Sequence, residues 1–259
     1  MDLQESADAL GVHYQTAYRW VREGTLPAVK IGSTYEIEES AVLALKAARE
    51  TPVPPPRQAT VRSWPATVQR LVAALETGDE LAARALVDRL AVGGMDAVRL
   101  VSNLLAPAMR TVGDHWAQGR ASVGCEHRAT GVCERILARL SPHPRGRPRG
   151  VAVVAMPSGD THGLAAAMAA AALRADRWRV HHLGSDLPPD ELAAMAADVS
   201  ADLVVVSVCY ATAADTREAV EAGRKGAPRV LVGEPGADVA ELVAAARSSA
   251  PTPWDADHR

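Results

Sequence analysis

The chain has 259 residues and a formal net charge of −3; 48% of its residues are hydrophobic, only 3% are aromatic, and phenylalanine is absent. This length allows one to three domains, with cores built from alanine, valine and leucine. No apolar run is long enough to span a bilayer, and the net charge argues against a generally basic nucleic-acid binder, so any DNA contact must come from a local basic face.

The N-terminus and the cysteines favour a cytoplasmic protein. The first residues lack the positive start and the apolar stretch of a signal peptide. Cys125, Cys133 and Cys209 are odd in number and show no metal-ligand spacing, so reduced thiols are the simplest expectation. We therefore expect a chain that works in the cytoplasm and not in a membrane.

Two proline-rich stretches, at 51–56 and 141–148, divide the chain. Clustered prolines cannot continue a helix and favour extended linkers. The predicted organisation is a domain at 1–50, a linker at 51–65, and further domains at 66–142 and 149–250.

The first domain is predicted to hold two helices and a short β-hairpin. Apolar residues at helical spacing predict helices at 3–10 and 14–23, with Gly11 ending the first. Residues 28–37 are typical of a small hairpin, or wing. Seven Lys or Arg and eight Asp or Glu fall within residues 1–66, so a basic face there would have to be local and doubled by dimerisation.

The second domain is predicted to be an antiparallel four-helix bundle, because four helical patterns follow one another with short connections. The patterns run over about 66–77, 79–92, 96–118 and 121–140.

The third domain alternates apolar strands with helices. The strands are expected at 151–156, 179–183, 203–207 and 229–232, and the helices at about 163–176, 188–199, 212–224 and 236–247. This alternation predicts right-handed βαβ units and a doubly wound, flavodoxin-like parallel sheet. Ligands of such sheets bind beyond the carboxyl ends of the strands.

The turn, second helix and wing of the first domain resemble the winged helix-turn-helix of the MerR and excisionase group. A recognition helix needs hydrogen-bonding side chains in its first turns, where base edges come within reach. The candidates are Tyr14, Gln15, Thr16 and Arg19 for base edges, and Arg22 and Lys30 for phosphates. The resemblance implies operator DNA as a partner; the alternative is a protein-interaction domain or a helical cap.

Asp160, His162 and Gly163 follow the first strand of the third domain, and Ala165 opens its helix. They resemble the Asp-x-His-x-x-Gly motif of cobalamin-binding domains, whose histidine replaces the cofactor's benzimidazole below cobalt. The resemblance implies that His162 is the lower axial cobalt ligand. Asp160 is placed to hydrogen-bond the other imidazole nitrogen, which would fix the tautomer and raise the basicity of the ring. The alternative for such a short motif is a helix cap or a solvated histidine.

Two further elements of that family are matched in order. Ser207 and Val208 end the third strand, where the family has a Ser-x-Leu or Ser-x-Thr element, and Gly233 and Glu234 end the fourth, where it has a Gly-Gly pair. The resemblance implies a slot for the detached benzimidazole between sheet and helices, where small residues let the ligand approach the backbone.

Three positions depart from the cobalamin-binding pattern. The last glycine of the motif is Ala165, the second glycine of the pair is Glu234, and prolines within 250–253 interrupt the expected last strand and helix. We therefore expect a reduced affinity for cobalamin. The alternative is a decayed site in a domain that only dimerises or binds a partner.

Trp116 is followed, after nine residues, by Glu126 and His127. This spacing resembles the Trp-x9-Glu-His motif of the CarH/LitR-type cobalamin-dependent photoreceptors, in which the bundle caps the upper face of the corrin and the motif surrounds the adenosyl group. Indole offers an apolar wall, while carboxylate and imidazole can hydrogen-bond a ribose. The alternative is that Trp116 belongs to the bundle core and that the other two are surface charges.

The resemblance covers nearly the whole chain, domain by domain. It implies an adenosylcobalamin-dependent transcriptional repressor that binds DNA in the dark as a homo-oligomer, a dimer or tetramer, and dissociates when light breaks the cobalt–carbon bond. Well-known members have a histidine directly after the motif tryptophan, whereas this chain has Ala117 there and His115 before it. One position turns a helical side chain by about a quarter of a circle or more, so we do not expect His115 to replace that ligand. His127 is the remaining candidate.

Two other functions stay open. A ligand-only regulator would sense cobalamin, or another tetrapyrrole, without photochemistry. A corrinoid-carrying subunit of a methyltransferase system would share the bundle, the sheet and the cobalt-ligating histidine, but the helix-turn-helix and the Trp-to-Glu-His spacing argue against it. The sequence shows no catalytic triad, phosphate loop or metal cluster, so we do not expect an enzyme.

Overall fold

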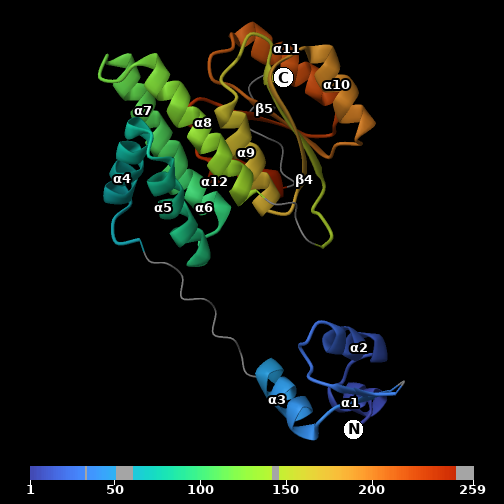
Figure 1. Cartoon of the computed structure of the whole chain (residues 1–259). Coiled ribbons are helices and arrows are strands. Elements are labelled where there is room, and N and C mark those ends of the chain that lie inside the picture. The colour runs from blue at the N-terminus through green and yellow to red at the C-terminus, as the bar shows by residue number, and fades with distance from the viewer. Residues whose placement is uncertain (33, 51–60, 142–145, 249–259) are drawn as a thin grey trace. The chain divides into compact units, whose positions relative to one another are not determined.

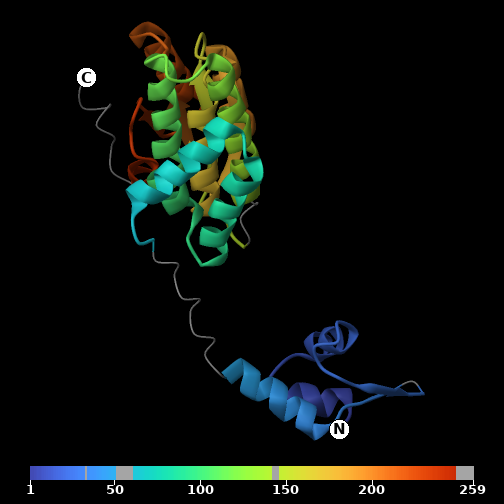
Figure 2. The same cartoon turned by 60° about the vertical axis from the view of Figure 1, so that its left-hand side comes forward.

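A computed structural model describes residues 1–32, 34–50, 61–141 and 146–248. The chain forms two compact units, Met1–Pro56 and Arg57–Arg259, which are described separately (Figures 1 and 2). Among the described residues, no helix combines the length and the apolar character that crossing a membrane requires.

The first unit contains three helices and a two-stranded antiparallel ribbon. Its elements are α1 (Leu3–Ala9), α2 (Tyr14–Arg22), β1 (Val29–Ile31), β2 (Thr34–Glu36) and α3 (Glu39–Glu50). The predicted helices and hairpin are present, within one or two residues of their expected ends. Helix α3 was not predicted.

Local sequence explains the entry into α1 and the turn after it. The side chain of Asp2 accepts a hydrogen bond from the backbone N–H of Glu5, and the side chain of Glu5 accepts one from the backbone N–H of Asp2, which forms a capping box. Gly11 has a φ of +64°, a left-handed conformation that favours glycine. A small core then holds the helices and the ribbon together; it consists of Leu3, Ala7, Leu10, Ala17, Leu26, Ile37 and Val42.

The second unit begins with a helical layer. Its elements are α4 (Trp64–Thr77), α5 (Glu80–Val92), α6 (Ala97–Leu100), a π-helical turn η1 (Val101–Leu105), α7 (Ala106–Ala117) and α8 (Val123–Leu140). The π turn ends two residues before Pro107, which has no N–H and whose ring would crowd the carbonyl of Asn103 in a regular helix. Elements α6, η1 and α7 therefore form one nearly continuous helix, as the pattern over 96–118 predicted.

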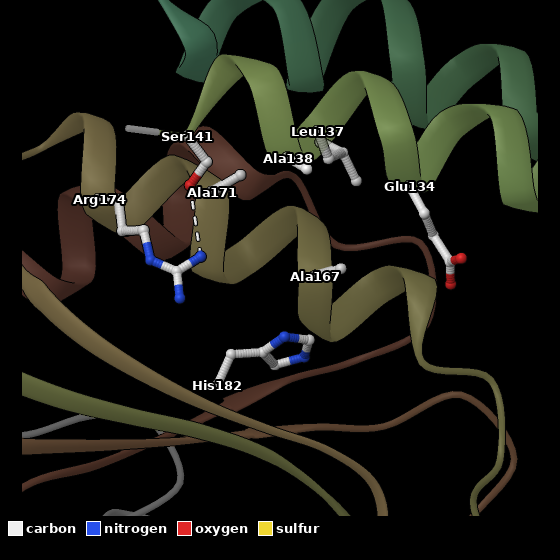
Figure 3. A pocket seen from close by; sticks show the side chains of 8 residues that line it. All are labelled: Glu134, Leu137, Ala138, Ser141, Ala167, Ala171, Arg174 and His182. Carbon is white, nitrogen blue, oxygen red and sulfur yellow. Dashed lines mark hydrogen bonds between the residues drawn. The ribbon is translucent and has the colours of Figure 1, made fainter. Parts of the chain in front are cut away.

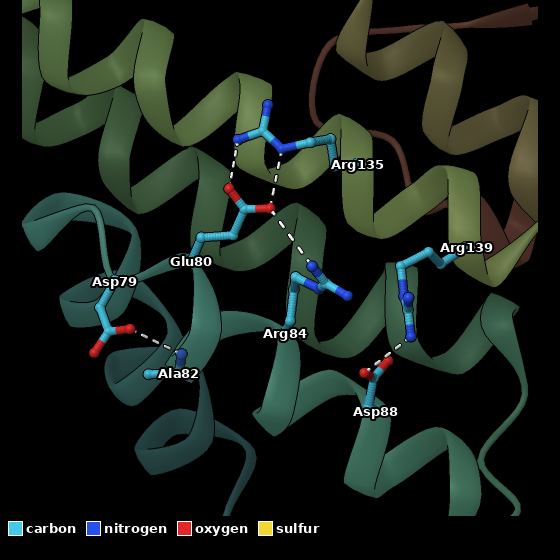
Figure 4. A network of polar contacts seen from close by, with 7 residues as sticks. All are labelled: Asp79, Glu80, Ala82, Arg84, Asp88, Arg135 and Arg139. Carbon is cyan, nitrogen blue, oxygen red and sulfur yellow. Dashed lines mark hydrogen bonds and ion pairs between the residues drawn. The ribbon is translucent and has the colours of Figure 1, made fainter.

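Ion pairs join α5 to α8 across the surface of this layer (Figure 4). The guanidinium of Arg135 donates to both carboxylate oxygens of Glu80, at 3.0 and 2.8 Å, and Arg139 donates to Asp88 at 3.2 Å. The hydrogen bond from Arg135 is the main reason that the pKa of Glu80 is lowered.

The rest of the second unit is a four-stranded parallel sheet with helices on both faces. In chain order it contains β3 (Val151–Pro157), α9 (Leu164–Ala175), β4 (Arg179–Leu187), α10 (Pro189–Asp198), β5 (Leu203–Ser207), α11 (Ala213–Gly226), β6 (Val230–Gly233) and α12 (Val239–Arg247). The strand order is β4-β3-β5-β6, and every neighbouring pair is parallel. The predicted alternation and the parallel sheet are confirmed.

Alternate residues of the buried strands face opposite layers. Val154 and Val205 pack with α9 and α12, whereas Val153 and Val204 pack with α10 and α11. Both faces of the sheet are thus covered, which is why its strands are continuous apolar runs.

The helical layer and the sheet domain share a core. Met168 and Ala171 of α9 are buried among residues of α4 to α8, so the second proline-rich stretch does not separate independent units. Helices α8 and α9 run in the same direction, with Ser141 near Arg174 at their carboxyl ends and Glu134 opposite Ala167 further back (Figure 3). The amino ends of α8 and α9 therefore lie at the same end of the unit.

Candidate functional site

Asp160 ties together two loops at the carboxyl edge of the sheet. Its side chain is fully buried. Its Oδ2 accepts N–H bonds from Cys209, Tyr210 and Ala211 at 2.6, 2.9 and 3.3 Å, and its Oδ1 accepts one from His162 at 3.4 Å. Burial by itself would raise the pKa of this carboxyl, but the backbone donors outweigh burial and the pKa is lowered. Asp160 is therefore a charged anchor for both loops at neutral pH.

The imidazole of His162 is accessible and available as a ligand. Its side chain is 56% exposed, and its ring packs against the ring of Tyr210 with 4.4 Å between the ring centroids. Nδ1 lies 3.9 Å from Oδ1 of Asp160, beyond hydrogen-bond distance, so the side-chain bond expected between them is not formed. Within the described part of the chain, neither ring nitrogen makes a hydrogen bond. An unengaged imidazole is a suitable ligand for cobalt, so the residues present fit a cobalamin.

Cys209 lies beside the His162 loop. Its Sγ is 3.9 Å from the carbonyl oxygen of His162. Burial, and then the neighbouring carboxylate of Asp160, raise the pKa of the thiol to about 11. The thiol is therefore protonated at neutral pH in the chain without a bound metal.

The ends of β5 and β6 bring the other predicted cobalamin residues together. Ser207 pairs with Gly233, and the N–H of Val208 donates to the carbonyl of Gly233 at 2.8 Å. Glu234 is exposed. A Cβ on Gly233 would lie 3.8 Å from the Cα of Ser207, an ordinary contact, so the carboxyl edge is built here from close-packed backbone.

The start of α9 completes this edge. Gly163 and Ala165 are half-buried, and a Cβ on Gly163 would lie 4.0 Å from the side chain of Ser185 at the end of β4. A pocket of about 420 Å³ does occur in this unit, but it lies between α8, α9 and β4, beside His182, and not at the ends of β5 and β6 (Figure 3). The predicted benzimidazole slot and this pocket are different places.

Trp116, Glu126 and His127 lie around the turn from α7 to α8. Trp116 is 44% exposed, so the alternative that it belongs to the core of the helical layer is wrong. Glu126 is partly buried, accepts a hydrogen bond from Thr130 at 2.9 Å and lies 3.7 Å from the imidazole of His127, which is 75% exposed. These side chains are at the amino end of α8, the same end of the unit as the His162 loop before α9.

In the first unit, the predicted base-reading side chains lie on α2. Tyr14, Gln15 and Arg19 are exposed and Thr16 is half-buried. Among the described residues, the one ion pair of Arg19 is a 3.9 Å contact with Glu23 in solvent, which leaves its guanidinium available. Arg22 and Lys30 are also exposed.

Comparisons with known proteins agree with this arrangement. Family models described as a helix-turn-helix domain, a B12 binding domain and a second B12 binding domain match residues 1–50, 67–141 and 150–248. The chain is 33% identical over 214 residues to the HTH-type transcriptional repressor CarA of Myxococcus xanthus, covering 78% of this chain and 68% of CarA. The chain belongs to the CarH-type family of cobalamin-binding transcriptional repressors.

A solved structure shares the fold of the second unit. The monomethylamine corrinoid protein of Methanosarcina barkeri aligns with a TM-score of 0.54 at 16% identity, over 71% of this chain and 98% of that protein. At this identity the likeness shows a common fold only, a helical layer with a parallel sheet.

Reasoning from sequence missed several residues around the site of this CarH-type chain. Tyr210 and Cys209 reach the His162 loop from a point 47 to 50 residues further along the chain, and no local pattern marks them. Tyr18 on α2 is 40% exposed and packs edge-on against Tyr35, with 6.0 Å between ring centroids. The position of Tyr18 on the exposed face of an amphipathic helix was the sequence signal that could have marked it.

Proposed function

We propose that this chain is a light-responsive repressor that binds operator DNA as a homo-oligomer, a dimer or tetramer, under the control of adenosylcobalamin in the cytoplasm. The observation that carries the proposal is the placement of two motifs from different domains at one end of the second unit. The Trp116 and Glu126–His127 turn and the His162 loop lie where the parallel helices α8 and α9 begin.

His162 would hold cobalt from below, while Asp160 keeps its loop in place through the backbone. The tail of the cofactor would lie along the small-residue edge formed by Gly163, Ala165, Ser207 and Gly233, next to Val208 and Glu234. Bound adenosylcobalamin supplies a cobalt–carbon bond that visible light can break. The chain would orient the corrin, exclude water from it and change its packing when the adenosyl group is lost.

The helical layer, proposed as the four-helix bundle at 66–142, would cap the upper face. The exposed indole of Trp116 offers an apolar wall, and Glu126 and His127 offer hydrogen bonds to a ribose. Trp116 would make this contact only while the cofactor carries its adenosyl group, so its packing would differ between the two cofactor states.

The first unit would act as a winged helix-turn-helix. Helix α2 would present Tyr14, Gln15, Thr16 and Arg19 to base edges. The other predicted contacts, Arg22 and Lys30, would reach phosphates. Because the unit has no net positive charge, tight binding would require several copies on one operator.

The test is an absorption titration of the full-length protein with adenosylcobalamin in the dark, repeated after green light. A protein-bound corrinoid spectrum that changes on illumination together with the oligomer size, read by size-exclusion chromatography of both samples, supports the proposal. No binding at all would reject it.

A second candidate is a cobalamin-sensing regulator without photochemistry. The specific observation is at the end of α7, where Ala117 replaces the expected upper ligand and His115 is engaged by Glu76. Bound cofactor with no light-dependent change in oligomer size would favour this candidate. A corrinoid-carrying methyltransferase subunit is less well supported, because the likeness to the corrinoid protein extends to fold alone, while a helix-turn-helix model matches residues 1–50.

A further inference from the structure

The end of α4 meets the end of α7 at Glu76. Nδ1 of His115 lies 2.5 Å from Oε1 of Glu76, and the two side chains are only 21% and 28% exposed. With hydrogen on Nδ1, the imidazole donates to the carboxylate, and hydrogen bonds to a charged acceptor are the stronger kind. The contact fixes the last turn of α7 against α4.

The main chain of Glu76 is also held, by α8. The last four carbonyls of a helix have no partner within it. The carbonyl of Glu76 accepts a hydrogen bond from the guanidinium of Arg128 and one from Sγ of Cys125 at 3.5 Å. The same guanidinium covers Gly78, where a Cβ would lie 2.9 Å from Cζ of Arg128. One residue of α4 therefore fixes both the end of α7 and the start of α8.

This junction sets the direction of Trp116. The carbonyl of His115 accepts N–H bonds from Arg120 and Ala121 at 2.8 and 3.1 Å, which closes the turn after α7. Successive residues of a helix are about 100° apart around its axis. With His115 held against α4, Trp116 must point elsewhere, and it is 44% exposed.

We propose that Glu76 and His115 are positioning residues that hold Trp116 in the orientation needed to meet a large upper axial group on cobalamin. The inference rests on the proposed function. In this inference His115, which precedes Trp116, positions the indole and does not bind cobalt. The inference also makes recognition of the adenosyl group depend on α4, the first helix after the linker from the DNA-binding unit.

The test compares dissociation constants for adenosylcobalamin and methylcobalamin, measured in the dark on the full-length protein. Glu76→Ala should weaken adenosylcobalamin binding by about tenfold, because a hydrogen bond to a charged group is lost. Methylcobalamin has a small upper group that needs no indole wall, so its affinity should change by less than about twofold on the same free-energy scale. Glu80→Ala is the matched control, since it removes a carboxylate bound to Arg135 on the same layer (Figure 4), and should change neither affinity.

Two further variants separate positioning from a purely structural role. Glu76→Gln keeps an oxygen that can accept from Nδ1 and should restore most of the selectivity. His115→Leu, of similar size but without a donor, should reproduce the selective loss. Equal weakening of both cobalamins, or no weakening of either, would overturn the inference. A wild-type chain that binds neither cobalamin would overturn the proposed function itself, and this inference with it.

Discussion

Asp160 shapes the site through its charge as well as its position. Its buried carboxylate holds the backbone of the His162 loop and of the loop after β5. The pKa of this carboxyl is lower in the folded chain than in the unfolded chain. Its contribution to stability is therefore present above the ordinary aspartate range and is lost as the pH falls through the lowered pKa.

Asp160→Asn should destabilise the protein at neutral pH by about 1–3 kcal/mol, because buried backbone donors lose a charged acceptor. Chemical denaturation at several pH values measures this, and the curves of variant and wild type should converge in acid. Asp202→Asn is the control, since Asp202 accepts one N–H bond from Val151 at 2.8 Å, at the opposite edge of the sheet. A larger effect from Asp202→Asn than from Asp160→Asn would refute this role.

His162→Ala should weaken cobalamin binding by about tenfold or more, in line with the cost of disturbing a metal's ligand shell. The absorption spectrum of the bound corrinoid should also change, because the lower axial ligand would be lost. His181→Ala, on the neighbouring β4 strand, provides a histidine control. An unchanged spectrum and affinity would remove His162 from the lower-ligand role.

Asp160 and His162 were proposed as site residues because one short segment carries the signal for both, and their cofactor roles stay a prediction. The partners of Asp160 were not predictable, because they lie 49 to 51 residues away in sequence and meet it only after the sheet has formed. The hydrogen bond expected between the two side chains is not formed, and the carboxylate instead accepts bonds from the backbone of His162 and of the loop after β5.

At the scale of elements, α2 carries the DNA-binding proposal. Arg19→Ala should weaken operator binding by about 1–3 kcal/mol, the usual worth of one base-reading arginine. Fluorescence anisotropy on a fragment selected from random DNA would measure this, while cobalamin affinity stays unchanged. Arg217→Ala, which removes the same charge from exposed α11, is the control. Equal losses from the two variants would mean that Arg19 contributes only general charge.

The buried strands were predicted well because valine runs between helices have few other structures open to them. Strand β4 runs on to Leu187, beyond the expected end at 183, through Gly184 and Asp186, which both have positive φ. Those residues discourage a strand, and the register with β3 shifts there to accommodate them.

Two helical features escaped prediction for different reasons. The π turn η1 arises from the conflict between Pro107 and the preceding turn, which a period of 3.6 cannot reveal. Helix α3 buries Val42 in the core of the first unit; its apolar spacing was visible, but the prediction of a domain at 1–50 assigned no element after the hairpin. Residues 250–253, expected to interrupt the last strand and helix, lie outside the described residues.

At the scale of the whole molecule, the cofactor site and the DNA-binding surface lie in different compact units. A ligand can control DNA binding across such a division only by changing the assembly of several chains or the freedom of the first unit. We expect a change in assembly, because residues 1–66 carry no net positive charge. A unit without positive charge depends on several copies for its affinity for DNA.

Control of assembly by light is tested most directly by light scattering on the size-exclusion peak of the full-length protein loaded with adenosylcobalamin. In the dark we predict a mass that is a multiple of the 27.2 kDa chain. After green light we predict a smaller mass, because the helical layer would no longer contact an adenosyl group. A mass that is identical before and after illumination, with the cofactor bound and its spectrum changed, would contradict control of assembly by light.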